Sequence, residues 1–127
     1  VMTAALDSRV TFYAAVHPAL CDHEAYTKKR ACGWPHYFYY YGAPDAKELK
    51  VVRYYDTANF ARCLTVPGWF SWGYNDNVCP PTSMYAAYNV VTSPKELHPY
   101  LETGHYWYQE QWDEWLAWIW KQMGISK

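Results

Sequence analysis

Short apolar runs alternate with helix-like segments along this chain. Residues 10–16 (VTFYAAV) form a continuous run rich in β-formers, and further strand candidates cover residues 66–72 and 94–100. Apolar side chains recur at helical spacing in residues 82–91 and 108–123. Strands that alternate with helices predict an α/β fold, a mostly parallel sheet flanked by helices. The unbroken apolar character of the first run predicts a strand buried on both faces.

The segments between these elements are less regular. Residues 1–6 are apolar and Ala-rich, as at the end of a helix, so we expect the chain to begin inside a longer protein. Residues 18–45 carry glycine and proline punctuation and predict loop with irregular helix. Residues 45–61 predict one or two helices, and Asp45 is a suitable residue to cap the first.

The last helical segment has a clear apolar stripe. Its members recur at intervals of three and four residues, so we expect this stripe to face the core. They are Trp112, Trp115, Leu116, Ile119 and Met123.

Length and charge limit the classes of function. The chain has 127 residues, enough for one domain at most, and 51% of them are hydrophobic. A formal net charge of −1 gives no electrostatic basis for binding nucleic acid or an anionic membrane. No apolar run reaches the roughly 18 residues of a membrane span. The cellular compartment stays open.

Aromatic residues make up 20% of the chain, and this has two interpretations. Trp and Tyr stack on sugar rings, but they also fill cores and interfaces. Residues 33–41 (GWPHYFYYY), which include Trp34, are hard to bury as a whole. They are candidates to line a cleft or a contact between the subunits of a homo-oligomer.

The four cysteines predict free, mostly buried thiols rather than a metal centre. Cys21 and Cys32 are the pair to test for a disulfide in a secreted protein. Together with His23 and His36 they do not match a standard structural zinc spacing. We therefore expect no metal or cofactor.

Asp76 and His105 are the candidate catalytic residues. Each follows the end of a strand candidate, and ligands of parallel α/β sheets bind beyond the carboxyl ends of the strands. An acid that orients a histidine is two-thirds of a hydrolytic triad. The alternative is that Asp76 only caps the following helix. His17 also ends a strand candidate and could border the same cleft, but the sequence gives it no partner.

The third member of a triad is missing from the sequence. In the α/β-hydrolase order the serine precedes the acid and lies in a G-x-S-x-G elbow. None of the five serines has these flanking glycines. A triad therefore requires a nucleophile upstream of Val1.

Residues 76–89 (DNVCPPTSMYAAYN), 94–97 (PKEL) and Gly104-His105 closely resemble the acetyl xylan esterase/cephalosporin C deacetylase family, carbohydrate esterase family seven. Residues 54–61 (YYDTANFA) resemble it too. The resemblance implies that residues 1–127 are the C-terminal part of one α/β-hydrolase domain. It also implies a serine esterase that removes O-acetyl groups from xylo-oligosaccharides, with Asp76 and His105 as triad acid and histidine.

Two departures from the family leave the substrate open. In the family a Glu-Gly-Gly or similar sequence follows the histidine, where this chain has Tyr106-Trp107-Tyr108. Residues 33–42 are unusually aromatic. Trp34, Tyr106 and Trp107 are therefore candidate substrate contacts. The alternatives are a related serine hydrolase of other ester or peptide specificity, and a non-catalytic carbohydrate-binding segment.

Overall fold

The three predicted strands form one parallel sheet. The computed structural model describes residues 1–125, and its strands are β1 (Tyr13–Val16), β2 (Gly68–Gly73) and β3 (Lys95–Tyr100). They lie in the order β1-β2-β3, with Tyr13 opposite Gly68 and Gly68 opposite Lys95. All three strands run in the same direction, so their carboxyl ends meet at one edge.

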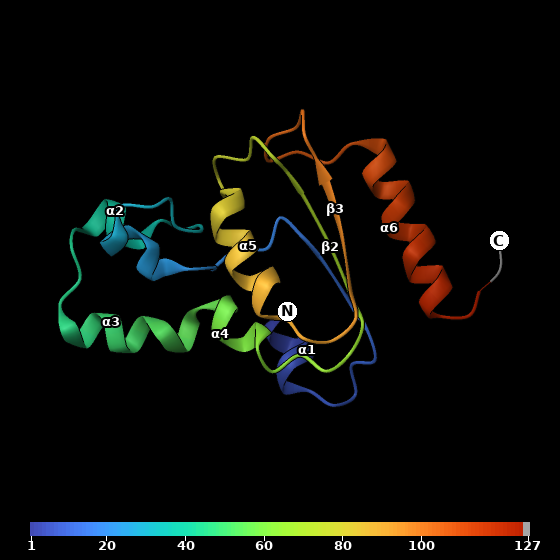
Figure 1. Ribbon diagram of the computed structural model, residues 1–127, viewed down its shortest axis with the longest axis horizontal. Coiled ribbons are helices and arrows are strands. Elements are labelled where there is room, and N and C mark those ends of the chain that lie inside the picture. The colour runs from blue at the N-terminus through green and yellow to red at the C-terminus, as the bar shows by residue number, and fades with distance from the viewer. Residues whose placement is uncertain (126–127) are drawn as a thin grey trace.

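Helices cover both faces of this sheet (Figure 1). One face carries α5 (Pro81–Val90), α4 (Thr57–Ala61) and α1 (Met2–Leu6), and the other carries α6 (Gln109–Gln122). The predicted α/β class, a parallel sheet between helices, is confirmed. Within residues 1–125, no helix combines the length and apolar character that a membrane crossing needs.

The irregular segment between β1 and β2 extends beyond α5 and α4, on the side of the molecule away from α6 (Figure 1). It contains η1 (His23–Lys28), α2 (Tyr37–Tyr41), α3 (Ala46–Val52) and η2 (Arg53–Tyr55). Asp45 caps α3 as predicted, accepting from the amides of Lys47 and Glu48 at 2.8 Å each. The Glu48 side chain accepts the Asp45 amide in return, which completes a capping box.

The core lies between β2 and the α5 face. Phe70 and Trp72 point from β2 into this layer and are fully buried, together with Met84 and Ala87 of α5. Every residue of β2 is buried because β2 is the central strand. The prediction that the first strand is buried on both faces is wrong. In β1 only alternate residues are buried, because β1 forms one edge of the described sheet.

The predicted inward stripe of α6 is wrong at two of its residues, while Trp115, Leu116 and Ile119 are partly buried. Gln111 and Trp118 are the buried residues of this helix, while Trp112 and Met123 are exposed. Gln111 donates to the buried Ser71 hydroxyl on β2 at 2.7 Å, and Trp118 donates to a carboxylate oxygen on β3 at 3.0 Å. These two hydrogen bonds determine which face of α6 packs against the sheet.

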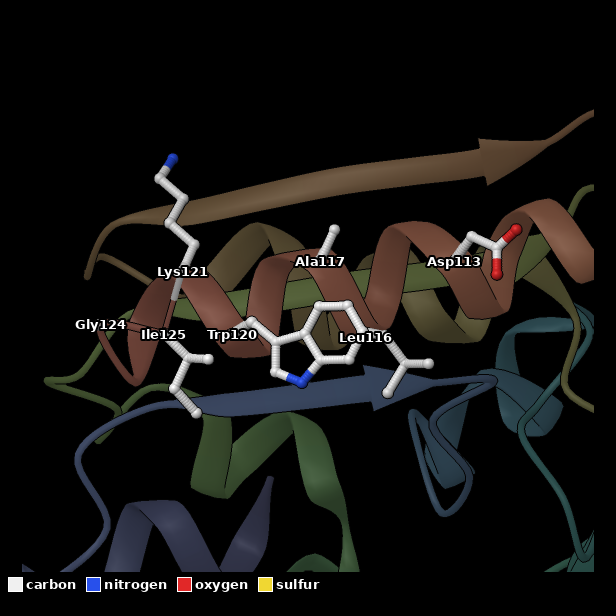
Figure 2. Close-up of a pocket in the computed structure, with 7 residues that line it drawn as sticks. All are labelled: Asp113, Leu116, Ala117, Trp120, Lys121, Gly124 and Ile125. Carbon is white, nitrogen blue, oxygen red and sulfur yellow. The ribbon is translucent and has the colours of Figure 1, made fainter. Parts of the chain in front are cut away.

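The opposite, apolar side of α6 borders an open hollow of about 700 Å³. Figure 2 shows Leu116, Trp120 and Ile125 projecting on one side of the helix.

Candidate active site

The turn after β2 buries one carboxylate and gives it fixed donors. The Asp76 side chain has no exposed surface. Its Oδ1 accepts hydrogen bonds from the amides of Val78 and Cys79, both at 2.8 Å. These two bonds close the turn that leads to Pro80 and α5 and hold the carboxylate in one orientation.

The loop after β3 is hydrogen-bonded to this turn. The amide of Tyr74 donates to the Tyr100 carbonyl at 2.9 Å, and the amide of Asn75 donates to the Thr103 carbonyl at 2.9 Å. The Asn75 side chain donates to the Leu101 carbonyl at 3.0 Å. The loops that carry Asp76 and His105 therefore form one unit.

Gly73 permits this close approach. A Cβ on Gly73 would lie 2.1 Å from the Gly104 carbonyl oxygen and 2.5 Å from that of Thr103. No side chain fits there, because both neighbours are backbone atoms. The glycine at the end of β2 is thus a condition for bringing the two loops together.

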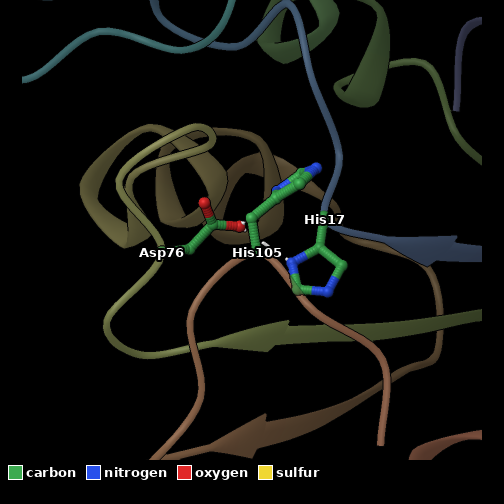
Figure 3. A group of neighbouring side chains, drawn as sticks. All are labelled: His17, Asp76 and His105. Atoms are coloured by element: carbon green, nitrogen blue, oxygen red, sulfur yellow. Dashed lines mark hydrogen bonds and ion pairs between the residues drawn. The ribbon is translucent and has the colours of Figure 1, made fainter.

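His105 reaches the buried carboxylate. Its Nδ1 lies 2.8 Å from Asp76 Oδ2, so the structure brings together the two residues that the strand-end positions predicted (Figure 3). The His105 side chain is 42% exposed, whereas the Asp76 side chain is 0% exposed. The histidine can therefore meet a substrate that the acid cannot reach.

His17 contacts the same carboxylate oxygen, a contact that sequence reasoning missed. It follows β1, and its Nδ1 lies 2.8 Å from Asp76 Oδ2 (Figure 3). Its amide donates to the Ser71 carbonyl at 2.9 Å, and its backbone takes a left-handed conformation with φ of 44°. The available signal was its place after β1, but identifying the partner required the strand order.

Opposing influences set the pKa of Asp76. Burial, the largest influence, raises it, but the amide of Cys79, His105, the amide of Val78 and His17 together outweigh burial. The pKa of Asp76 is therefore below its usual value. The carboxylate is ionised at neutral pH and accepts from all four donors.

Burial has the opposite result at His17. It lowers the pKa of His17 more than the hydrogen bond to Asp76, the charge of Asp76 and a hydrogen bond to the Tyr106 backbone raise it. At neutral pH His17 is therefore a neutral imidazole. Since a carboxylate only accepts hydrogen bonds, the proton of neutral His17 belongs on Nδ1.

The arrangement suits general acid–base chemistry at His105. A hydrogen bond to the carboxylate keeps the proton of neutral His105 on Nδ1 and leaves the Nε2 lone pair free to take a proton. Asp76 then stabilises the imidazolium that forms.

The same three residues could also offer ligands to a metal ion. One ligand atom each from His17, Asp76 and His105 lies within 4.8 Å of the others. However, Oδ2 is at hydrogen-bond distance from both imidazoles, and Oδ1 is used by backbone amides. Hydrogen bonds between these groups therefore account for the geometry. The described contacts do not gather Cys21, His23, Cys32 and His36 into such a group.

Comparison with known proteins agrees with the resemblance noted in the sequence. The family described as acetyl xylan esterase (AXE1) matches residues 1–122. The chain belongs to the acetyl xylan esterase family.

Relatives of known structure have the same arrangement of helices and strands. An acetyl xylan esterase from Paenibacillus sp. R4 superposes with a TM-score of 0.77 at 28% identity, over 91% of this chain and 39% of that one. Acetyl xylan esterase 1 from Thermoanaerobacterium sp. JW/SL YS485 gives 0.78 at 25% identity, over 94% and 40%. The predicted α/β-hydrolase fold is confirmed.

The chain is similar in sequence to the acetyl esterase Axe7A of Xylanibacter ruminicola (strain ATCC 19189). The two are 47% identical over 95 residues, which is 75% of this chain and 22% of the relative. The chain thus spans about a fifth of this relative and about two fifths of the two solved acetyl xylan esterases.

The aromatic candidates for substrate contact occupy different positions around the site. Tyr106 follows His105 and is 64% exposed. Trp107 is half-buried, stacks on Trp112 with ring centroids 4.0 Å apart, and lies 6.5 Å from the His17 ring. Trp34 is 49% exposed, and its backbone lies at the Cys79 thiol. Only Trp107 therefore has a ring contact with the Asp76–His105–His17 group.

The cysteines of this acetyl xylan esterase family member are free thiols. Cys21, Cys32 and Cys79 are buried, and Cys63 is exposed. Cys21 Sγ donates to the carbonyls of Pro18 and Ala19 at 3.4 and 3.2 Å. Burial raises the pKa of Cys79 to about 11, so this thiol beside Asp76 is not a nucleophile at neutral pH.

Proposed function

We propose that this chain supplies the acid and the histidine of a serine esterase that removes O-acetyl groups from acetylated xylo-oligosaccharides. The observation that carries the proposal is the 2.8 Å contact between the buried Asp76 carboxylate and the exposed His105 imidazole. Membership of the acetyl xylan esterase family supports the reaction and the substrate class. Residues 1–127 are then the C-terminal part of one α/β-hydrolase domain.

The nucleophilic serine comes from residues outside this chain. Within residues 1–125, His105 is bonded to Asp76 rather than to a serine. Ser71 and Ser83 are buried, and their hydroxyls donate to the carbonyls of His98 and Pro80 at 2.7 Å each. Ser126 lies outside the described residues. Neither Ser71 nor Ser83 therefore directs its hydroxyl to the exposed His105 imidazole.

In this mechanism His105 moves protons and Asp76 supports it. Nε2 of His105 removes the serine proton as the serine oxygen attacks the acetyl carbonyl carbon. The imidazolium then protonates the departing sugar oxygen, which leaves an acetyl-serine. His105 next activates water, which attacks the acetyl carbon, and acetate is released as the serine regains its proton.

The substitution Asp76→Asn in the full-length polypeptide tests the proposal. The two amides on Oδ1 hold the oxygen of the new amide, so its NH2 group faces His105. The imidazole must then accept at Nδ1 and carry its proton on Nε2, where it cannot act as a base. We expect kcat/KM on an acetylated xylo-oligosaccharide to fall about 10⁴-fold, as for the comparable change in a serine protease. This equals about 5 kcal/mol of transition-state stabilisation.

Asp56→Asn is the matched control. Asp56 is also buried and accepts from the amides of Asp22, His23 and Ala58 at 3.0, 2.8 and 2.9 Å, with no imidazole partner. In each variant an NH2 group replaces one buried acceptor oxygen, so both should melt at lower temperature, since a lost hydrogen bond to a charged group costs about 1.5–3 kcal/mol. Only Asp76→Asn should lose activity. Near-normal kcat/KM with lowered melting in both variants would mean that Asp76 only stabilises the turn before α5.

The choice of ester is tested with a substrate panel. Tyr106 and Trp107 stand where the family resemblance leads us to expect Glu and Gly or similar residues, and Tyr106 is exposed. A sugar-binding role for Tyr106 predicts that Tyr106→Ala raises KM for the acetylated xylo-oligosaccharide but not for p-nitrophenyl acetate. Equal KM changes for both esters, or higher kcat/KM for bulkier acyl or peptide substrates, would favour another serine hydrolase.

A further inference from the structure

We propose that His17 is a positioning residue of the site: its Nδ1–H fixes the Asp76 carboxylate that orients His105. The inference rests on the proposed function, since it adds a second histidine to the same acid. His17 is too deeply buried to touch a substrate, with 5% of its side chain exposed. It therefore acts through Asp76.

The carboxylate has a complete set of donors only when His17 is present. Oδ1 accepts the amides of Val78 and Cys79, and Oδ2 accepts the imidazoles of His17 and His105, all four at 2.8 Å. A carboxylate has about four acceptor positions. Three donors are fixed in place: two belong to the backbone, and His17 is buried. The His105 side of the site is therefore built on an acid that cannot rotate.

Its surroundings argue against a simple space-filling role for His17. Its Nε2 is buried and makes no hydrogen bond of good geometry among the described residues. The Tyr106 backbone is near enough to raise the pKa of His17, but by less than burial lowers it. Burying an imidazole with one unsatisfied nitrogen is unfavourable, whereas an apolar side chain would carry no such cost. The charge-assisted bond from Nδ1 to Asp76 is the interaction that compensates. The backbone φ of 44° is also uncommon for a residue with a Cβ.

The charge state of His17 suits this role. Its ring lies 4.8 Å from that of His105. A second cation at this distance would oppose the proton that His105 takes up in the reaction. Because burial lowers the pKa of His17, it donates to Asp76 as a neutral group. His17 therefore hydrogen-bonds to Asp76 without placing a second positive charge beside His105.

Two substitutions in the full-length polypeptide separate positioning from packing. His17→Asn keeps an N–H donor near the position of Nδ1, and Asn tolerates the left-handed backbone. His17→Leu keeps much of the volume but has no donor. We expect His17→Leu to lower kcat about 10- to 100-fold with little change in KM, as for the loss of one charge-assisted hydrogen bond. His17→Asn should recover most of kcat.

An NMR measurement on selectively [¹⁵N]histidine-labelled protein gives a readout that does not depend on the two His17 variants. We expect neutral His17 to carry its proton on Nδ1, with a downfield-shifted Nδ1–H signal that moves in Asp76→Asn. A spectrum with the proton on Nε2 overturns the proposal, even if His17→Leu fails to fold. Wild-type kcat in folded His17→Leu, or equal losses in the Leu and Asn variants, overturns it as well.

Failure of the proposed function gives a different pattern. If wild-type protein lacks esterase activity, or if Asp76→Asn retains it, the triad is wrong, while the His17 tautomer still reports on the hydrogen bond. If Asp76→Asn is inactive and His17→Leu is fully active, only the positioning role is lost.

Discussion

At the residue scale, one carboxylate both fixes a turn and binds two imidazoles. Asp76 uses Oδ1 to accept backbone amides in the turn before α5 and Oδ2 to accept imidazoles. A carboxylate can do both because its two oxygens point in different directions. The alternative that Asp76 caps α5 is wrong, because this helix begins after Pro80 without a side-chain cap. The bonds to the amides of the preceding turn hold the acid in place for the imidazoles.

The titration of His17 follows from its burial. Its pKa lies below the ordinary value of about 6.5, so neutral His17 contributes stability above that pH. This contribution is lost as pH falls through the folded-state pKa, because the unfolded chain takes up the proton more readily. The charged or titratable groups that face His17 are Asp76, which raises its pKa, and His105, which lowers it.

We expect an NMR titration of wild-type protein to show a midpoint below 6.5 for His17. In Asp76→Asn the midpoint should fall further, because the carboxylate that favours the cation is gone. Asp56→Asn is the control and should leave the midpoint unchanged. A wild-type midpoint above 6.5 would show that the carboxylate outweighs burial and that His17 is cationic near neutral pH.

At the scale of elements, the site depends on how two loops pack at the ends of β2 and β3. Hydrogen bonds from Tyr74 and Asn75 join the loops, and Gly73 leaves the space for them to meet. The geometry of Asp76 and His105 is thus set by backbone contacts several residues away from either side chain.

Gly73→Ala should disturb both stability and activity. The added Cβ would lie 2.1 Å from a backbone oxygen, so the loops must separate. We expect kcat/KM of the full-length polypeptide to fall at least 10-fold, with a destabilisation of about 1–3 kcal/mol, as for an overpacked site. Circular dichroism melting and ester hydrolysis provide the two measurements.

Gly104→Ala is the control in the opposing loop. Its Cβ would meet the Asn75 carbonyl oxygen at 3.6 Å, an ordinary contact, and Gly104 has no positive φ. We expect near-wild-type melting and activity for this variant although it adjoins His105. Equal effects of both alanines would mean that loss of glycine flexibility, rather than close packing, explains the result.

At the scale of the whole molecule, this chain matches only part of the length of its relatives. It spans 22% of one relative and about two fifths of two solved ones. The exposed apolar side of α6 borders an open hollow. Within residues 1–125, an acid and histidines come together without a serine partner.

We expect the 127-residue chain alone to have no esterase activity, because no serine within residues 1–125 is hydrogen-bonded to His105 and could be activated by it. Hydrolysis of p-nitrophenyl acetate by the purified chain is the measurement, with His105→Ala as the control for background. Turnover that disappears in His105→Ala would contradict the prediction and place the nucleophile inside the chain.

The sequence by itself determined the α/β class and the Asp76–His105 pair. Alternation of apolar runs with helices implies parallel strands, and parallel strands bring the residues that follow them to one edge. The family resemblance, carried by residues 76–89, agreed with this arrangement. Local pattern was sufficient because each of these features is encoded within a short segment.

Only the tertiary structure decided the partner of His17 and the buried face of α6. His17 meets Asp76 because β1 lies beside β2, and strand order is a long-range property that no single segment records. In α6, helical periodicity could not choose the face, because the sheet offers a hydroxyl at Ser71 that Gln111 satisfies. Which side chains of α6 are buried depends on the sheet residues that they meet as well as on their own hydrophobicity. Those sheet residues are distant in sequence.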